Sequence, residues 1–205
     1  MGWWSERVVP WCIELCCGSK ANAKEREKAL VGLSGTVLEI GFGSGLNVPL
    51  YPAGIARVLA VDPSERARRI GRKRIAAARC PIETVGLDAE SIRLDARSAD
   101  NALSTFTLCT IPDAGRALVE VKRILRPGGR LYFLEHGRSP DPGVARWQDR
   151  LNGMQRAIAG GCNINREIPA LLEGAGFRVE SLESYYAPGP PTHTYLYRGV
   201  AVAPG

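Results

Sequence analysis

The stretch that decides the fold runs from Gly35 to Gly45 and reads GTVLEIGFGSG. Its first half is an apolar run typical of a buried parallel strand, and its second half is a glycine-rich turn. Gly41, Gly43 and Gly45 allow the backbone to turn sharply and to approach a ligand closely, because no side chain intervenes. The stretch therefore predicts a strand whose carboxyl end faces a ligand.

The residues around this turn bear on the identity of the ligand. The glycines are spaced G-x-G-x-G, one residue shorter than the G-x-G-x-x-G of dinucleotide-binding proteins. Glu39 precedes the turn, where its charge would repel a pyrophosphate but suits a cationic ligand such as S-adenosylmethionine. Asp62 ends the next apolar run, about 20 positions later, where a carboxylate accepts hydrogen bonds from a ribose. A nicotinamide cofactor is the alternative if the spacing is relaxed.

The rest of the chain alternates strand and helix patterns. Helices are expected after Ser64, which can cap the first of them, and at 114–125 and 167–175. Further strands are expected at 57–61, 82–85, 102–109 and 131–134, followed by an antiparallel pair at 177–182 and 194–202. Strands that alternate with helices indicate an α/β fold with a parallel sheet.

Four segments in order resemble the motifs of the class I S-adenosylmethionine-dependent methyltransferases. They are EIGFGSG at 39–45, VD at 61–62, GLDAE at 86–90 and LRPGGRL at 125–131. The resemblance implies a Rossmann-like, mostly parallel seven-stranded sheet with an antiparallel last strand and helices on both faces. It also implies methyl transfer from S-adenosyl-L-methionine, by a domain at 35–205 with a substrate-side insertion at about 140–166.

The same resemblance implies roles for individual residues. Glu39 and Gly41 would lie beside the methionine moiety, and Gly43 and Gly45 would shape the loop. The remaining cofactor-binding residues would be Asp62 at the ribose, Pro63 and Ser64 beside ribose and adenine, Asp88 and Ala89 at the adenine, and Thr107 near the methyl group.

A narrower resemblance is to small methyltransferase-like proteins whose animal members methylate thiols at membranes. The matching stretches are TLCT at 107–110, FLEH at 133–136, WQ at 147–148 and GCNINR at 161–166, whereas 92–101 departs from the pattern. A more distant likeness is to quinone-biosynthesis C-methyltransferases. The resemblance implies a small, lipophilic acceptor with a thiol sulfur favoured. The alternatives are quinone or phenol C- or O-methylation and a non-catalytic, membrane-associated S-adenosylmethionine-binding module.

On the acceptor side the sequence is less decisive. His136 lies just past the fifth predicted strand and is interpreted as a base or orienter of the acceptor, with a structural histidine as an equal alternative. Cys109 is placed at the end of the fourth strand, against the substrate. Cys162 and Arg166 lie in the insertion, where Arg166 either holds an anionic substrate group or forms a structural salt bridge.

Composition and charge limit which partners and which cellular compartment are expected. The 205 residues carry 27 Lys and Arg against 21 Asp and Glu, a net charge of +6, and no pattern of nucleic-acid recognition accompanies the basic run at 66–79. Six cysteines without a C-x-x-C pair indicate reduced thiols in the cytoplasm and no metal site. Residues 1–34 are expected to form a helical lid or a surface anchor, since charges at Glu6, Arg7 and Glu14 exclude a membrane span. The oligomeric state is not indicated.

Overall fold

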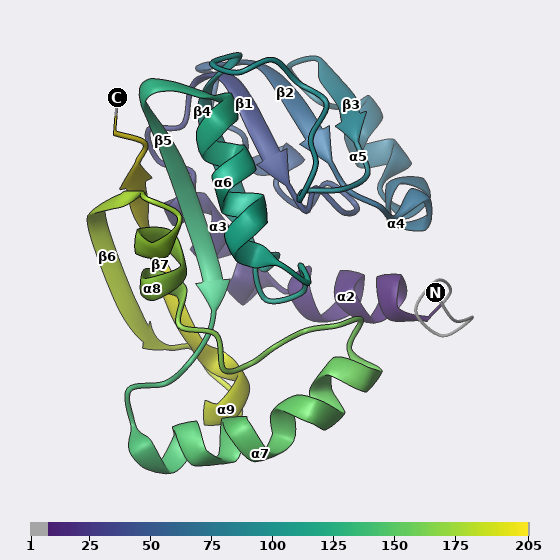
Figure 1. Cartoon of the computed structure of the whole chain (residues 1–205). Helices are drawn as coiled ribbons and strands as arrows, with labels where there is room; N and C mark the ends of the chain where they lie inside the picture. Colours follow the sequence, from purple (N-terminus) through teal and green to yellow (C-terminus); the bar gives the residue numbers. More distant parts are fainter. Residues whose placement is uncertain (1–7, 205) are drawn as a thin grey trace.

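The computed structural model describes residues 8–204, which fold around one seven-stranded sheet (Figure 1). The strand order is β3-β2-β1-β4-β5-β7-β6. β1 to β5 pair in parallel, and β7 is antiparallel to both β5 and β6. The strands are β1 (Gly35–Ile40), β2 (Ile55–Val61), β3 (Ile82–Gly86), β4 (Ala99–Thr105), β5 (Leu125–His136), β6 (Arg178–Tyr186) and β7 (Tyr195–Val202). The predicted mostly parallel α/β sheet is confirmed.

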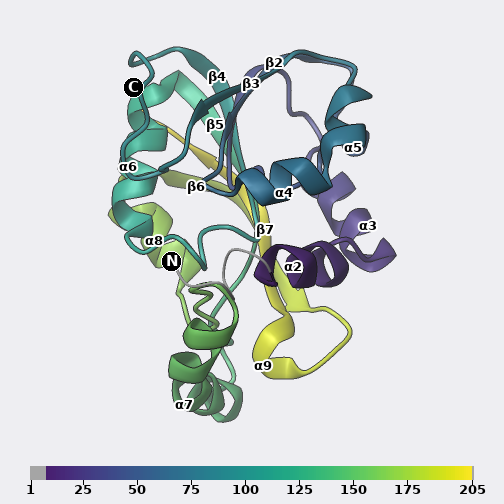
Figure 2. The same cartoon turned by 90° about the vertical axis from the view of Figure 1, so that its right-hand side faces the viewer.

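Helices cover both faces of the sheet, as predicted. α6 and α8 lie on one face and α3 on the other, while α2 and α7 lie beyond the carboxyl ends of the parallel strands (Figures 1 and 2). The helices are α2 (Val9–Cys17), α3 (Lys20–Ala29), the 3-10 turn η1 (Val48–Leu50), α4 (Glu65–Ile70), α5 (Arg72–Ala76), α6 (Ala114–Ile124), α7 (Pro142–Ile158), α8 (Ile168–Gly174) and α9 (Pro191–Thr194). Within residues 8–204, no helix has both the length and the apolar character needed to cross a bilayer.

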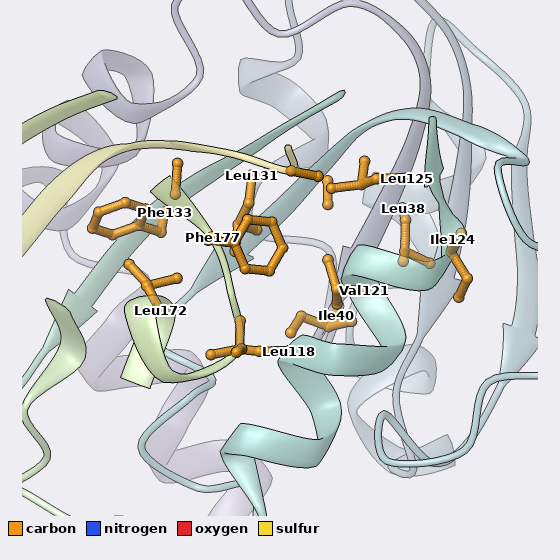
Figure 3. Close-up of a cluster of buried hydrophobic side chains, with 14 of the residues drawn as sticks. Leu38, Ile40, Leu118, Val121, Ile124, Leu125, Leu131, Phe133, Leu172 and Phe177 are labelled. Atoms are coloured by element: carbon orange, nitrogen blue, oxygen red, sulfur yellow. The ribbon is translucent and has the colours of Figure 1, made fainter. Parts of the chain in front are cut away.

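The period of two in the strands places alternate side chains in two hydrophobic cores. Leu38 of β1 and Phe133 of β5 point toward α6 and α8, where they pack with Leu118 and Leu172 (Figure 3). Val37 of β1 points to the opposite core, beneath α3. Each fully buried Leu or Phe contributes about 1.5–3 kcal/mol. The two cores hold the strand ends in fixed positions and so fix the edge at which the site is built.

The fourth strand differs from its prediction. It begins at Ala99 and ends at Thr105, because Phe106 adopts a positive φ of 54° that no strand continues through. Cys109 therefore lies in the turn beyond the strand, not at the strand end as predicted. The fifth strand is longer than predicted at both ends, since Leu125 and Arg130 also pair with β4, and Glu135 and His136 with β7.

The basic helix after Ser64 is broken into α4 and α5. The Ser64 hydroxyl accepts a hydrogen bond from the Ala67 amide at 3.1 Å, so the predicted cap is confirmed. The break falls at Gly71, where a Cβ atom would lie 1.9 Å from the carbonyl oxygen of Ser44. Glycine at position 71 therefore lets this helical pair contact the turn after β1 directly.

A buried amide attaches α7 to the rest of the molecule. Gln148 is fully buried, and its Nε2 donates to the carbonyls of Gly137 (3.0 Å), Ile164 (2.8 Å) and Thr192 (3.1 Å). Its Oε1 accepts from the Ser139 amide at 2.9 Å. One side chain thus joins α7 to the loop after β5, to the 161–166 segment and to α9.

We expect Gln148→Ala to destabilise the protein by roughly 2–4 kcal/mol, because it leaves several buried backbone groups without partners. Urea unfolding measures the change. The control is Met154→Ala on the same helix, whose side chain is 58% exposed and whose loss costs little. Equal stability of the two variants would contradict this role of Gln148.

Candidate active site

The site lies where the strand order reverses. β1 and β4 are neighbours, but the chain continues from β1 to β2 on one side and from β4 to β5 on the other. Open parallel sheets bind ligands at the carboxyl ends of the strands at such a switch point. Two loops meet there, the glycine turn 41–45 after β1 and the turn 106–110 after β4.

The glycine turn and the turn after β4 are in direct contact. Gly41 has a φ of 68°, and a Cβ atom at this position would lie 1.9 Å from Oγ1 of Thr107. Only glycine satisfies both conditions. Gly43 and Gly45 share the left-handed conformation, with φ values of 56° and 71°. The three glycines therefore form the tight loop that the sequence predicts.

Asp62 follows β2 and fastens the glycine turn. Its Oδ2 accepts from the Gly43 amide at 2.8 Å, and its Oδ1 accepts from the Ser64 amide at 2.7 Å. The residue is 9% exposed, and burial raises the pKa of its carboxyl while the two amides act in the opposite direction. The carboxylate is thus held by backbone donors at the mouth of the site.

Glu39 is the last-but-one residue of β1 and is buried. Its carboxyl accepts hydrogen bonds from Nδ2 of Asn47 at 2.9 Å and from the hydroxyl of Tyr51. Burial raises the pKa of Glu39 to about 7, despite these donors and the nearby guanidinium of Arg26. The Arg26 guanidinium itself donates to Asn47 and to Thr105. A cationic ligand beside Glu39 would favour the ionised form of this carboxyl and so lower its pKa.

The segment predicted to hold the adenine follows β3. The carbonyl of Gly86 accepts from the Asp62 amide at 3.2 Å, which keeps the ends of β2 and β3 together. Asp88 is exposed, and its Oδ1 accepts from the Glu90 amide at 2.8 Å in a tight turn. Ala89 packs partly buried beside it. Both residues, like Pro63 after Asp62, therefore lie at the same sheet edge as the glycine turn.

A buried carboxylate that the sequence analysis assigned no role orders the turn after β4. Glu135, near the end of β5, accepts from the Ser104 hydroxyl at 2.6 Å and from the Thr107 amide at 2.9 Å. It is fully buried, and burial raises the pKa of its carboxyl. The sequence feature that could have pointed to Glu135 is an acidic residue inside the otherwise apolar run of β5.

Three predicted acceptor-side residues meet at one point. Sγ of Cys109, Sγ of Cys162 and a ring nitrogen of His136 lie within 4.8 Å of one another. Nε2 of His136 is 3.2 Å from Sγ of Cys162, and His136 Nδ1 is buried without a hydrogen-bond partner among the described residues. The thiol of Cys109 and the imidazole of His136 lower the pKa of Cys162. We refer to these three residues as the Cys-His-Cys cluster.

Arg166, predicted to hold an anionic substrate group or to form a salt bridge, forms no salt bridge within residues 8–204. Its guanidinium donates to the backbone carbonyls of Leu108, Ile111 (2.6 Å) and Pro112 (3.2 Å). These bonds use its donors to hold the turn after β4 against the 161–166 segment. Asn163 strengthens the same connection, because its backbone amide donates to the Cys109 carbonyl at 2.8 Å.

The first described helix lies over the glycine turn. Glu14 of α2 accepts from the Ser44 hydroxyl and forms a salt bridge of 2.6 Å with Arg74 of α5. Arg74 also donates to the Ser44 carbonyl at 2.7 Å. A segment far from the turn in sequence thus clamps it, which no local pattern indicates. Residues 1–7 of the segment predicted to form a helical lid or a surface anchor lie outside the described residues.

Comparison with known proteins agrees with this geometry. Residues 38–133 match the model of a methyltransferase domain family. Human thiol S-methyltransferase TMT1B is 36% identical over 175 residues, which span 80% of this chain and 71% of that protein. The demethylmenaquinone methyltransferase of Clavibacter sepedonicus is 33% identical over 113 residues, covering 55% of this chain and 46% of that protein.

Solved structures show the same fold. An S-adenosylmethionine-dependent methyltransferase from Mesorhizobium loti superposes with a TM-score of 0.67 at 18% identity, covering 90% of this chain and 98% of that one. A SAM-dependent methyltransferase from Aquifex aeolicus superposes with a TM-score of 0.65 at 20% identity, covering 95% of this chain and 98% of that one.

The matched domain family and the curated relatives identify the chain as a methyltransferase, with the fold of the S-adenosylmethionine-dependent ones. More narrowly, the chain belongs to the family that contains human TMT1B.

We expect Glu14→Gln to loosen the glycine turn, because it removes the charge that Arg74 pairs with. The pair is about one-quarter exposed, so its loss costs on the order of 1 kcal/mol. Hydrogen exchange followed by mass spectrometry should show faster exchange in peptides that contain residues 41–45. Glu27→Gln, on the exposed face of α3, is the control. Unchanged exchange in Glu14→Gln would show that α2 does not clamp the turn.

Proposed function

We propose that this chain transfers a methyl group from S-adenosylmethionine to the sulfur of a small, lipophilic thiol. One observation carries the proposal: the turn after β4 touches the glycine turn through Thr107 and, two residues later, presents Cys109 to the Cys-His-Cys cluster. The cluster offers soft sulfur atoms and an imidazole to an acceptor. The similarity to TMT1B supports a thiol as the acceptor.

We propose that the cofactor occupies the switch point. In this arrangement Glu39 and Gly41 lie beside the methionine moiety, and Gly43 and Gly45 shape the loop around it. Thr107 lies near the methyl group. At the other end, the ribose lies at Asp62 with Pro63 and Ser64 beside it, and the adenine lies at Asp88 and Ala89. Buried polar groups support this placement, because Glu39 and Asp62 are ionisable carboxyls turned toward a single edge.

S-adenosylmethionine supplies an electrophilic methyl group on a sulfonium. Alignment of the acceptor sulfur with that methyl group accounts for much of such a displacement. We propose that His136 orients the acceptor or takes its proton, and that Cys109 and Cys162 line the acceptor site. The thiolate is the reacting form of a thiol, so a group that favours it raises the rate at neutral pH.

We also propose that residues 1–34 form a lid over the 35–205 domain. The contact of Glu14 with Ser44 and Arg74 supports this arrangement. Trp11 and Leu15 of α2 are 54% and 81% exposed, which suits peripheral contact with a membrane or the entry of a lipophilic acceptor. Six free cysteines accord with a cytoplasmic setting.

The acceptor class is tested with purified protein, S-adenosylmethionine and a panel of lipophilic thiols, hydrophilic thiols, quinols and phenols. We expect the thioether and S-adenosylhomocysteine to form together, fastest with the lipophilic thiols. Transfer to carbon or oxygen alone would show quinone or phenol methylation instead. Cofactor binding without turnover on any acceptor would show a non-catalytic module.

We expect His136→Gln to lower kcat/KM for a thiol by about tenfold or more. Its cofactor dissociation constant should stay near that of the wild type, because the glycine turn is untouched. The matched control is His193→Gln, at the exposed second histidine on α9. Unchanged turnover in His136→Gln, or a loss equal to that of His193→Gln, would contradict the assignment.

Cofactor affinity should depend on pH through Glu39. The free protein holds this carboxyl with a pKa of about 7, and the ammonium of the methionine moiety favours its ionised form. Binding below neutrality therefore releases a proton, so affinity should fall as the pH drops from about 8 to about 6, by at most about tenfold per unit.

Isothermal titration calorimetry at several pH values measures this dependence. Glu39→Gln should bind more weakly, because it lacks the charge, and should show a flat profile. Glu120→Gln on α6 is the control and should keep the slope. A wild-type affinity that does not change with pH would contradict the proposed contact.

A further inference from the structure

The Cys-His-Cys cluster brings together the side chains that bind transition metals. Cys109 comes from the turn after β4, His136 from the last position of β5, and Cys162 from the segment after α7. Their ligand atoms all lie within 4.8 Å of one another, and both cysteines are buried. The three positions are far apart in sequence, which is why the absence of a C-x-x-C pair led the sequence analysis to predict no metal.

The surroundings of His136 do not fit a structural histidine. A buried imidazole that serves only to support the fold has hydrogen-bond partners for its ring nitrogens. Here Nε2 faces the sulfur of Cys162 at 3.2 Å, and Nδ1 is buried with no partner within residues 8–204. A buried ring nitrogen that the protein leaves unpaired calls for an explanation, and a catalytic or ligand-binding role is one of them.

We propose that the Cys-His-Cys cluster binds a zinc ion. Two thiolates and one imidazole form a donor set that suits zinc, and hard cations such as magnesium prefer oxygen. In a tetrahedral site, bond lengths of about 2.3 Å to sulfur and 2.0 Å to nitrogen separate neighbouring ligand atoms by about 3.5–3.8 Å. The observed separations reach this arrangement through small side-chain movements.

The site has an open position. The described residues provide three ligand atoms to the cluster and no fourth from another His, Cys, Asp or Glu. Three protein ligands with one open position characterise catalytic zinc, whereas structural zinc is closed by four. Cys109 of the cluster is two residues from Thr107, which contacts Gly41 of the cofactor loop.

The open position suits the acceptor sulfur, and this step rests on the proposed function in the form in which His136 orients the acceptor, as a zinc ligand, and does not take its proton. A thiol that binds the zinc releases its proton to solvent and becomes a thiolate. A sulfur lone pair then forms the new S–CH3 bond, while the bond from the methyl carbon to the sulfonium breaks and its electron pair remains on S-adenosylhomocysteine. The neutral thioether is a weaker ligand than the thiolate and leaves the zinc.

Metal content and cobalt spectroscopy test the site without reference to turnover. The full chain is purified without chelators and zinc is measured by mass spectrometry. We expect about one zinc per chain. Cobalt exchanged into the site should give the intense visible bands of tetrahedral coordination and a thiolate-to-cobalt charge-transfer band. A lipophilic thiol added without S-adenosylmethionine should intensify that band by adding a third sulfur ligand.

The variants are Cys109→Ser, Cys162→Ser and His136→Gln, with Cys12→Ser on the exposed face of α2 as the matched control. Each of the three should retain less than about a tenth of the wild-type zinc at equal protein concentration, and Cys12→Ser should retain all of it. Thermal melting identifies the variants that fold, and one folded variant is sufficient for the comparison.

Several outcomes overturn the proposal. They are a wild-type protein that binds no zinc from an equimolar solution, a preference for magnesium over zinc, and equal zinc in the cluster variants and Cys12→Ser. Zinc binding without any thiol methylation would refute the proposed function and leave the metal site standing. Thiol methylation at an unchanged rate after complete removal of zinc would refute the metal's role and leave the function standing.

Discussion

The buried carboxylate of Glu135 holds the turn after β4 in place, and both halves of the site depend on that turn. It accepts hydrogen bonds from the Ser104 hydroxyl and the Thr107 amide at the point where β4 ends. A buried ionisable group is costly unless it is paired, so its donors are part of what makes the arrangement stable. The next residue along β5 is His136. The hydrogen bonds of Glu135 therefore also fix the backbone position from which the imidazole side chain extends.

The cofactor side and the acceptor side share this turn. Thr107 packs against Gly41 at a distance that excludes any side chain on the glycine, and Cys109 joins His136 and Cys162. The carbonyls around Cys109 are in turn held by Arg166 and Asn163 from the segment after α7. A shift of the turn would move Thr107 and Cys109 together, which under the proposed function would keep the donor methyl group and the acceptor sulfur in a constant relation.

Local patterns in the sequence predicted the glycine turn and the Ser64 cap correctly, and the cofactor contacts stay predictions. The glycine turn, the cap at Ser64 and the carboxylate of Asp62 lie within single strand-turn-helix units, so spacing along the chain is enough to place them. The boundary of β4 was wrong, because the positive φ of Phe106 is a tertiary effect in a run that alternates like a strand.

The acceptor half depends on contacts between segments that are distant in the chain. Arg166 was interpreted as a residue that holds an anionic substrate group or forms a salt bridge, and in the fold its guanidinium donates to the backbone carbonyls of Leu108 and Ile111 instead of to an acidic side chain. The clamp of Glu14 on Ser44 and the meeting of Cys109, His136 and Cys162 have no local signature. Only the folded chain brings these residues together.

The most direct test of this account is a crystal structure with S-adenosylhomocysteine and a lipophilic thiol bound together. We expect the homocysteine sulfur beside the contact of Gly41 with Thr107, and the acceptor sulfur against Cys109, His136 and Cys162. The chain also has an open surface pocket between α6 and α8, lined by residues that include Pro112, Asp113 and Leu171. An acceptor bound in that pocket, away from the cluster, would contradict the account.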